Sequence, residues 1–398
     1  DEAYREFSDE DPTPELIRQP NVLLIRTLSK AFGLAGLRIG VAIGHASVVE
    51  LMRTVGDPYP VAGPSLAIAY RAIRNTGQWQ KRYLSQVREE REQLVGLLGE
   101  LGQRPMPSEG NFVLSEFDNA AWVADGLAGL GVAVRGFPDR PRLASSLRIT
   151  CPGSPPGWRK LEASLRAVLA PQALLFDLDG VLADVSQSYR RAIQQTAGHF
   201  GVPVSHEDIE EAKAAGDANN DWVLTWRLVQ RQRPEIAFDA VRERFEALYQ
   251  GTSEEPGLWQ QEEPLVSRRQ LQELVSRMPL AIVTGRPRRD AERFLANFGL
   301  EDLFSTVVTM EDGPAKPDPS PVVEALERLG VERAWMVGDT PDDMRAARAA
   351  GVLPVGFAAQ RPSPEFEQNL LCSGAARVFT DLTDLVGCLP AAESEGVE

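Results

Sequence analysis

The stretch "LLFDLDGVLADV", residues 174–185, places two aspartates directly after an apolar run. Such a run is typical of a buried strand, and Gly180 supplies the turn residue that ends it. Asp177 and Asp179 therefore emerge where the strand stops. In an open parallel sheet, the carboxyl ends of the strands form the edge at which binding and catalytic sites are built. We expect a functional site here.

Five more short apolar segments follow, mostly alternating with helical sequence. They are "LAIVTG" (280–285), "FSTVVTM" (304–310), "AWMVGD" (334–339), "LPVGF" (353–357) and "ARVFT" (376–380). This alternation predicts an α/β fold with a doubly wound parallel sheet. Residues 186–275 lack strand signals and read as helices rich in charged and aromatic residues, which predicts a helical insertion after the first strand.

Polar residues stand at the ends of the later strands as well. Thr284 closes the second segment, Lys316 lies in "AKPDP", and "VGDTPDDM" carries Asp339 and Asp343. With the two earlier aspartates they predict four converging carboxylates, one hydroxyl and one ammonium group. Converging carboxylates repel one another unless a cation joins them. Oxygen ligands, and three histidines without a ligand spacing, favour Mg²⁺ over zinc.

These motifs, in this order, resemble the haloacid dehalogenase (HAD) superfamily over residues 172–388. The resemblance implies a Rossmann-like fold in which the helical insertion is a cap that closes over the substrate. It implies that Asp177 attacks phosphorus to give an aspartyl phosphate, and that Asp179 protonates the leaving oxygen and then activates water. Thr284 and Lys316 would hold the phosphoryl oxygens.

The same resemblance implies a magnesium site formed by Asp177, Asp339 and the carbonyl of Asp179, with Asp343 orienting or ligating. The second aspartate favours a phosphatase acting on a small phosphomonoester over a dehalogenase. The sequence is similar to the phosphoglycolate phosphatase and phosphomutase branch, so a mutase is an open alternative. In the insertion, the polar run "GDANNDW" (216–222) either touches substrate or caps a helix.

A second motif lies in "RTLSKAFGLAGLRIG", residues 26–40. Lys30 stands beside the hydroxyls of Thr27 and Ser29, and Arg38 can present forked donors to a phosphate. A pyridoxal 5′-phosphate (PLP) site requires a lysine nucleophile, together with hydroxyl and arginine side chains that bind the phosphate. The glycines of this stretch do not match GxGxxG, which argues against a dinucleotide motif.

Together with "DEAYREF" (1–7), this stretch resembles the fold-type I PLP aminotransferases, specifically the histidinol-phosphate aminotransferase group. The resemblance implies that Lys30 binds the cofactor covalently and shuttles the proton. Asp1 would pair with the pyridinium nitrogen, and Tyr4 would hydrogen-bond the phenolic oxygen. The implied cofactor-binding set is Asp1, Tyr4, Thr27, Ser29, Lys30 and Arg38.

Arg135 and Arg148, in "GVAVRGF" and "SSLRIT", resemble the arginines with which that family binds the substrate anion. A surface salt bridge is the alternative for each. The resemblance covers about 1–168, the C-terminal half of such an enzyme, and implies an incomplete large domain followed by the small domain. The chain begins at Asp1, without a methionine or a preceding turn, which predicts a fragment of a longer protein that would be a homodimer.

Composition narrows the classes of function. A length of 398 residues favours two or three domains, and a net charge of −15 argues against a nucleic-acid surface. No apolar run approaches the ~20 residues that cross a bilayer, and we expect no signal peptide. Three scattered cysteines without a CxxC pair fit a reducing cytoplasm. We expect a cytoplasmic protein that binds a phosphorylated small molecule and an amino donor or acceptor, not nucleic acid or membrane.

We therefore predict a bifunctional fusion that uses PLP and Mg²⁺: an aminotransferase region at 1–168, a HAD phosphatase at 172–388, and a disordered acidic tail at 389–398. Histidine biosynthesis is favoured by analogy, since histidinol phosphate made by the first enzyme must next lose its phosphate. One alternative is that the aminotransferase-like part is a non-catalytic dimerisation module. Another is a regulatory binding protein with degenerate sites, against which the intact Lys30 and Asp177 argue.

Overall fold

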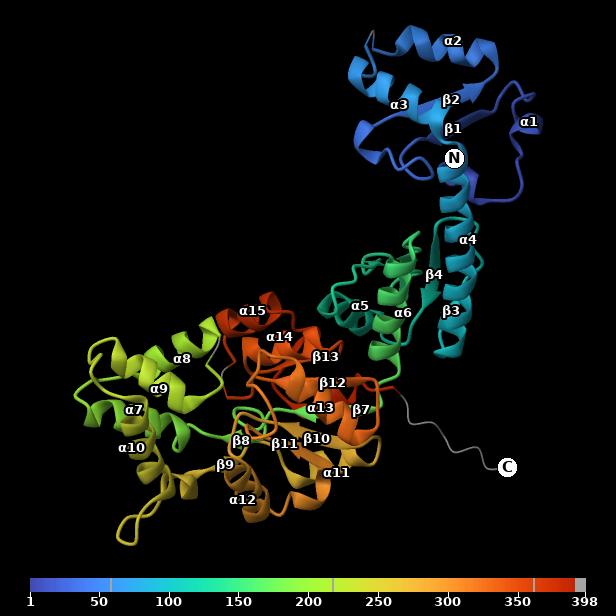
Figure 1. Ribbon diagram of the computed structural model, residues 1–398. Coiled ribbons are helices and arrows are strands. Elements are labelled where there is room, and N and C mark those ends of the chain that lie inside the picture. The colour runs from blue at the N-terminus through green and yellow to red at the C-terminus, as the bar shows by residue number, and fades with distance from the viewer. Residues whose placement is uncertain (58, 217, 361, 391–398) are drawn as a thin grey trace, which may run out of the picture. The chain divides into compact units, whose positions relative to one another are not determined.

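The computed structural model describes residues 1–57, 59–216, 218–360 and 362–390, which form two compact units (Figure 1). The first unit consists of residues 1–120 and 134–162, and the second of residues 121–133 and the chain from 163 onward. The predicted tail, 389–398, lies outside the described residues from 391 on. Among the described residues, no helix combines the length and apolarity that a membrane span requires.

The second unit is built on one parallel sheet of six strands. Its strands are β7 (Ala173–Phe176), β10 (Leu280–Val283), β11 (Thr306–Val308), β12 (Ala334–Gly338), β13 (Leu353–Phe357) and β14 (Val378–Phe379). Their order is β11-β10-β7-β12-β13-β14, so the direction of strand addition reverses between β7 and β12. Ligands of open α/β sheets bind at such a switch point. The predicted doubly wound parallel sheet is confirmed.

Alternate residues of the central strands face opposite sides of this sheet. On one side, Ala173 and Leu175 of β7 and Met336 of β12 lie in a core cluster with residues of two covering helices. Those helices are α13 (Ser320–Leu329) and α14 (Pro341–Ala349). On the other side, Phe176 makes an edge-to-face contact with Phe304. Burial of both faces explains why the strands read as continuous apolar runs.

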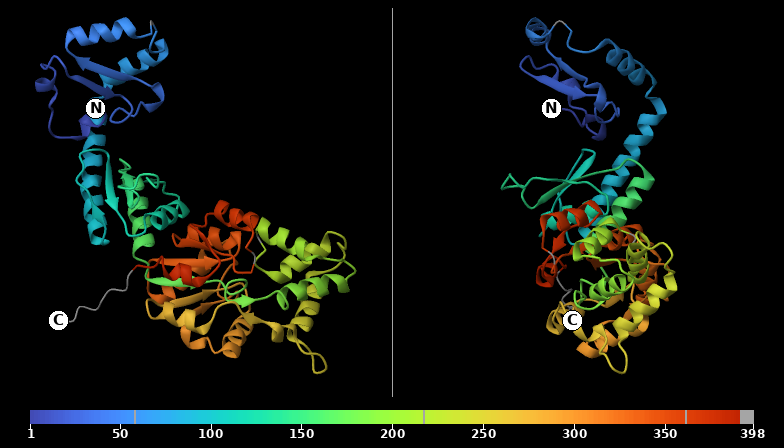
Figure 2. Two further views of the ribbon diagram at one scale, coloured as in Figure 1. Left: turned by 180° about the vertical axis from the view of Figure 1, so that it is seen from behind. Right: turned by 90° about the vertical axis from the view of Figure 1, so that its left-hand side faces the viewer.

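A group of helices forms the insertion after β7, green to yellow in Figures 1 and 2. It contains α7 (Tyr189–His199), α8 (His206–Ala215), α9 (Asp221–Gln230), α10 (Phe238–Gln250) and η3 (Leu258–Gln261). A two-stranded pair, β8 (Ala183–Asp184) with β9 (Glu263–Pro264), joins its entrance to its exit. The helix α11 (Arg268–Val275), which the predicted insertion included, contacts α16 (Leu382–Val386) and η4 (Glu301–Leu303) instead. The remaining helices of the unit are α12 (Arg288–Phe298) and α15 (Pro364–Cys372).

The second unit also includes most of α5 (Ala120–Gly129) and the end of α6 (Pro155–Leu169), both inside the range predicted for the first domain. The ring of Trp122 on α5 lies 4.9 Å from that of Trp335 on β12, and both side chains are buried. The indole Nε1 of Trp335 donates a 2.8 Å hydrogen bond to the carbonyl of Ala167 on α6. Two helices from the range predicted for the first domain therefore cover the face of β12 that carries Trp335.

The first unit contains two small antiparallel sheets. One pairs β1 (Leu23–Thr27) with β2 (Gly40–Gly44), and the other has the order β3-β4-β6-β5. Its further elements are η1 (Arg5–Phe7), α1 (Thr13–Leu16), η2 (Ala35–Leu37), α2 (Ala46–Val55), α3 (Gly63–Asn75), α4 (Gly77–Glu100), β3 (Arg104–Pro105), β4 (Phe112–Glu116), β5 (Arg135–Gly136) and β6 (Ser146–Thr150). The strand β1 is only partly buried, because Leu24 is its one buried residue and Ile25 is 42% exposed.

We predict that Trp122→Ala lowers the free energy of unfolding of the second unit by about 3 kcal/mol, because the substitution leaves a cavity against Trp335. Urea denaturation followed by far-UV circular dichroism measures this. The matched control is Asp125→Ala on the same helix, which removes a partly exposed ion pair with Arg377 and should cost less than about 1 kcal/mol. Equal effects of the two variants would contradict the assignment of α5 to this unit.

Candidate active site

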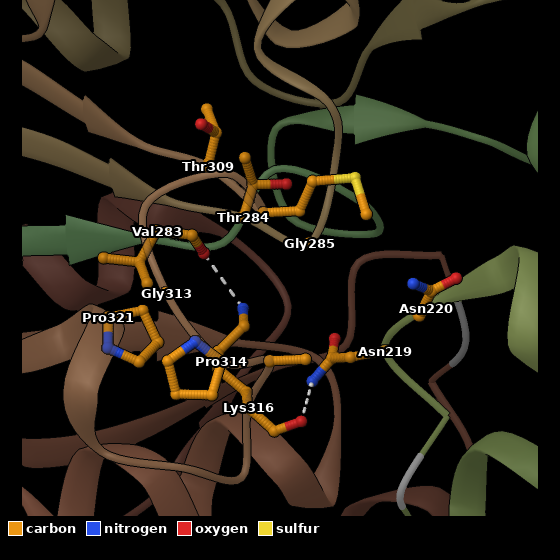
Figure 3. A pocket seen from close by; sticks show the side chains of 12 residues that line it. Asn219, Asn220, Val283, Thr284, Gly285, Thr309, Gly313, Pro314, Lys316 and Pro321 are labelled. Carbon is orange, nitrogen blue, oxygen red and sulfur yellow. Dashed lines mark hydrogen bonds between the residues drawn. The ribbon is translucent and has the colours of Figure 1, made fainter.

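The centre of the site is a buried lysine that holds two carboxylates. Asp177 follows β7 and Lys316 lies in the loop before α13, and each is less than 5% exposed. The Nζ of Lys316 donates 2.9 Å hydrogen bonds to Asp177 Oδ1 and to the carbonyl of Val283, and lies 2.6 Å from Asp343 Oδ1. Figure 3 shows the bond from Lys316 to Val283.

A third carboxylate, that of Asp339 at the end of β12, completes a group that can hold a cation. The ligand oxygens of Asp177, Asp339 and Asp343 lie within 4.8 Å of one another. Asp343 is held by the backbone nitrogen and hydroxyl of Thr340, at 3.0 and 2.6 Å. Among the described residues, the buried Oδ1 of Asp339 has no hydrogen-bond partner. An all-oxygen ligand set with an unsatisfied buried oxygen fits Mg²⁺.

The electrostatics of this group also favour a cation. Burial raises the pKa of Asp177 to about 7, and the charges of Asp343 and Asp179 add to the increase while Lys316 opposes it. Burial likewise raises the pKa of Asp339 well above its usual range, with contributions from Asp177 and Asp343. Burial alone would lower the pKa of Lys316, but the two carboxylates beside it raise it. A divalent ion would offset the repulsion that produces the raised carboxylate values.

Two glycines allow the carboxylates to approach the backbone this closely. Gly180 has φ +77°, and a Cβ there would overlap the carboxylate of Asp339. A Cβ at Gly338 would overlap the side chain of Asp343. Gly180 is therefore required by its positive φ as well as by the packing of the site, and Gly338 is required by the packing alone.

Asp179 does not join the metal group through its side chain but forms an ion pair with Arg286. Arg286 Nε lies 2.5 Å from Asp179 Oδ1, and its Nη1 lies 2.9 Å from Glu262 Oε2. The Arg286 side chain has no exposed surface and packs over the ring of Tyr189. Glu262 and Tyr189 belong to the inserted segment, so this arginine connects Asp179 to it.

A cavity of about 200 Å³ adjoins Lys316 on the side of the insertion. Thr284, at the end of β10, lines it, and its Oγ1 accepts a 3.2 Å hydrogen bond from the backbone nitrogen of Arg286. Asn219 reaches the same cavity from the inserted segment and donates a 3.2 Å hydrogen bond to the carbonyl of Lys316 (Figure 3). In the predicted polar run 216–222, Asn220 also caps α9, and Asp217 lies outside the described residues.

Both regions of the chain match known protein families. Residues 174–357 match the family described as Haloacid dehalogenase-like hydrolase, and residues 1–160 match Aminotransferase class I and II. This chain joins part of an aminotransferase to a HAD-like hydrolase domain. Both resemblances read from the sequence are thereby confirmed. In the HAD domain, Asp177 lies at the switch point between β7 and β12.

Two curated relatives each match part of the chain. An imidazoleglycerol-phosphate dehydratase of Phytophthora nicotianae is 47% identical over 242 residues, 56% of this chain and 54% of that protein. A histidinol-phosphate aminotransferase of Xanthomonas euvesicatoria pv. vesicatoria (strain 85-10) is 42% identical over 154 residues, 38% of this chain and 42% of that protein. The chain thus spans about half the length of these relatives.

Solved structures that resemble the chain include one described as a predicted phosphoglycolate phosphatase from Haemophilus somnus 129PT. It is 20% identical, covers 54% of this chain and 96% of that chain, and has a TM-score of 0.44. A second, described as a predicted phosphatase from Clostridium acetobutylicum, is 17% identical, covers 55% and 97%, and also has a TM-score of 0.44. The strand order of the six-stranded sheet and the family match over residues 174–357 define the fold of this domain.

The aminotransferase region brings some of its predicted cofactor residues together. Lys30 Nζ lies 5.4 Å from the centre of the Tyr4 ring. The hydroxyls of Thr27 and Ser29 are hydrogen-bonded to each other at 2.8 Å. Asp1 and Tyr4 line an open cavity of about 570 Å³. A lysine beside a phenol and a hydroxyl pair fits the predicted PLP site in part.

The predicted arginines of this region are placed differently from one another. Arg135 and Arg148 face each other across β5 and β6 as register partners. Arg148 packs over the ring of Phe112, whereas Arg135 is exposed. Arg38 is exposed, has φ +55°, and donates a 3.0 Å hydrogen bond to the carbonyl of Ala35. The roles predicted for these three residues stay predictions.

Three cations near the HAD site were not singled out from the sequence. Arg286 stands two residues after Thr284, so strand alternation could have placed it at the same sheet edge. Arg190 on α7 and Lys213 on α8 line the cavity that contains Asp177 and come from helices about twenty residues apart. A charged residue on a helix is usually solvated, and nothing in the local pattern distinguishes these two.

We predict that Lys316→Met lowers the free energy of unfolding of the HAD domain by about 3–5 kcal/mol in the absence of divalent ions. The substitution leaves the carboxylates of Asp177 and Asp343 buried without their shared cation. Chemical denaturation in chelator measures the change. Arg269→Met, at an exposed position of α11, is the control and should change the value by less than about 0.5 kcal/mol. A loss in Lys316→Met no larger than the control would contradict this account of the site.

Proposed function

We propose that the HAD domain is a magnesium-dependent phosphatase that hydrolyses a small phosphomonoester through an aspartyl phosphate on Asp177. The observation that carries the proposal is the buried Asp177 carboxylate, held 2.9 Å from Lys316 Nζ and grouped with the carboxylates of Asp339 and Asp343. A strand-end carboxylate so placed has a cation on one side for the phosphoryl oxygens and a metal site on the other.

In the first step, a carboxylate oxygen of Asp177 attacks phosphorus while the bond from phosphorus to the ester oxygen breaks. Asp179, two residues further, donates its proton to the leaving oxygen. Lys316 and Thr284, which line one cavity, bind the non-bridging oxygens as their negative charge grows. The products are an alcohol and an acyl phosphate on Asp177.

In the second step, Asp179 takes a proton from a water molecule as the water oxygen attacks phosphorus. The bond from phosphorus to Asp177 breaks, which restores the carboxylate and releases inorganic phosphate. The ion pair with Arg286 fixes Asp179 Oδ1 and leaves the other carboxylate oxygen for proton transfer. A mutase would instead return the phosphoryl group to a second hydroxyl of the substrate.

When bound, Mg²⁺ would supply the positive charge that lets an anionic carboxylate approach an anionic phosphate. Asp177, Asp339 and Asp343 are the side chains that would hold it. The experiment that tests the function is phosphate release from a panel of phosphomonoesters. Turnover should require Mg²⁺, and hydrolysis that persists in excess chelator would contradict the proposal.

We predict that Asp177→Asn reduces phosphate release to background, because the amide keeps the shape of the nucleophile without its charge. Asp179→Asn should lower kcat by roughly 10²–10⁴, the usual weight of general acid–base catalysis. Asp239→Asn, an exposed aspartate of α10 paired with Arg242, serves as control and should keep wild-type activity. Substantial turnover by Asp177→Asn would rule out the aspartyl phosphate.

For the N-terminal region we propose a PLP-dependent aminotransferase site at Lys30, with a role in histidine biosynthesis. The family match over residues 1–160 and the relatives named for histidinol phosphate and imidazoleglycerol phosphate support it. The contact of Lys30 with Tyr4 and the hydroxyl pair Thr27–Ser29 supply the local geometry. Bound PLP would act as the electron sink of the reaction.

We predict that Lys30 is the lysine most readily labelled when the chain is incubated with PLP and reduced with borohydride. Hydrogen bonds from neighbouring side chains to the phosphate of PLP, worth about 1.5 kcal/mol, would favour labelling of Lys30 about tenfold over labelling of a solvated lysine. Peptide mapping measures the label, and the exposed Lys81 and Lys160 are internal controls. Equal labelling of the three lysines would count against Lys30 as the cofactor residue.

A further inference from the structure

Arg286, in the loop after β10, links Asp179 to two buried groups of the insertion. Its Nε donates a 2.5 Å hydrogen bond to Asp179 Oδ1, and its Nη1 donates a 2.9 Å hydrogen bond to Glu262 Oε2. Glu262 in turn accepts a 2.9 Å hydrogen bond from the hydroxyl of Tyr249 on α10. Arg286, Glu262 and Tyr249 are all buried. This series of contacts fixes the orientation of the Asp179 carboxylate.

Aromatic rings hold the guanidinium of Arg286 in the same position. Its Cζ lies 4.8 Å from the centre of the Tyr189 ring and 5.5 Å from that of Phe294. A desolvated guanidinium over an aromatic face is stabilised by the charge distribution of the ring. Arg286 therefore cannot turn away from Asp179 without losing these ring contacts and leaving Glu262 as an unpaired buried charge.

One donor of Arg286 remains for a ligand. Its Nη2 is buried and, among the described residues, has no hydrogen-bond partner. Arg286 and Asp179 line a cavity of about 10 Å³, which is room for about one water molecule. Asn219 and Gly285 line both this small cavity and the 200 Å³ cavity beside Lys316. A water molecule there would have a donor and a carboxylate as partners, next to the space proposed for the phosphoryl group.

A purely structural role for Arg286 would be to fasten the insertion to the sheet. Arg293 of α12 already makes such a connection. Its Nη1 donates a 2.7 Å hydrogen bond to Gln250 Oε1 on α10, and its Cζ lies 4.4 Å from the centre of the Trp259 ring on η3. Fastening alone therefore does not require the contact between Arg286 and Asp179.

We propose that Arg286 is a positioning residue that holds Asp179 and a water molecule beside the aspartyl phosphate, so that water rather than a second substrate hydroxyl takes the phosphoryl group. The inference rests on the proposed phosphatase function. The water oxygen forms a bond to phosphorus, its proton goes to Asp179, and the bond from phosphorus to Asp177 breaks. Inorganic phosphate leaves and the Asp177 carboxylate is restored.

The fate of an aspartyl phosphate depends on which acceptor is activated first. A mutase must keep this intermediate until a second hydroxyl reaches the site, so its acid–base residue must not activate water before then. The contacts that orient Asp179 come from Arg286 and the insertion and involve no group of a substrate. Asp179 is therefore oriented for water activation throughout the reaction, and the aspartyl phosphate should be short-lived.

The test measures formation and decay of the aspartyl phosphate separately. The full chain with Mg²⁺ is mixed with p-nitrophenyl phosphate that carries labelled phosphate, chased with unlabelled ester, and quenched in acid at successive times. Nitrophenol leaves with little help from an acid, so formation depends little on Asp179, whereas decay depends on it as the base. The wild-type label should decay in water alone, at a rate that phosphomonoesters of the panel do not increase.

Arg286→Lys keeps the charge but cannot contact Asp179 and Glu262 together, so it should slow decay by about 10- to 100-fold and formation by less than about threefold. In an Asp179→Asn background the same substitution should change decay by less than about threefold, because Arg286 acts through Asp179. The matched control, Arg293→Lys, should leave both rates within about threefold of wild type. If Arg286→Lys does not fold, Glu262→Gln decides the question and should slow decay alone by about tenfold.

The outcomes that overturn the inference differ from failure of the proposed function. Equal slowing of formation and decay by Arg286→Lys, an equal effect of Arg293→Lys, or a full additional effect in Asp179→Asn would show that Arg286 only fastens the insertion. Wild-type label that leaves only when a phosphomonoester of the panel is added would show that a hydroxyl is the acceptor. In these cases the aspartyl phosphate stands. If the chain forms no label and releases no phosphate with Mg²⁺, the proposed function itself fails.

Discussion

The HAD domain depends on one buried ammonium group. Lys316 Nζ lies 2.9 Å from Asp177 and 2.6 Å from Asp343 and is anchored by the carbonyl of Val283. Buried carboxylates are costly unless they are paired, so the end of β7 and the start of α14 can meet only because this lysine lies between them. The parallel sheet supplies the other half of the constraint, because it sets β7 beside β12 and brings Asp339 to the same edge.

The insertion completes the site rather than covering it passively. Arg286 connects Asp179 to Glu262, and Asn219 hydrogen-bonds the backbone of Lys316, so both Asp179 and Lys316 are linked to the inserted segment. Arg190 and Lys213 add positive charge from the same side. If the proposed phosphatase function holds, these contacts would fix the acid–base residue Asp179 and keep the inserted segment against the site.

Local sequence patterns predicted the strands of the sheet and the polar residues at their ends. The six strands and their terminal residues Asp177, Thr284 and Asp339 follow from apolar runs that end in polar groups. The pair β8–β9 was not predicted, since two strands of two residues leave no periodic signal. The packing of Trp122 on Trp335 was also missed, because it joins residues more than two hundred positions apart and crosses the domain boundary predicted at residues 168–172. Arg286 looks like any solvated arginine until its buried partners are known.

The central claim is that Asp177 accepts the phosphoryl group. The most direct measurement is rapid acid quenching of the chain during turnover of a phosphate-labelled substrate with Mg²⁺, followed by peptide mapping. The account predicts label on the peptide that contains Asp177, released by hydroxylamine and absent when Mg²⁺ is withheld. Label on another residue, or turnover in which the protein never carries label, would contradict it.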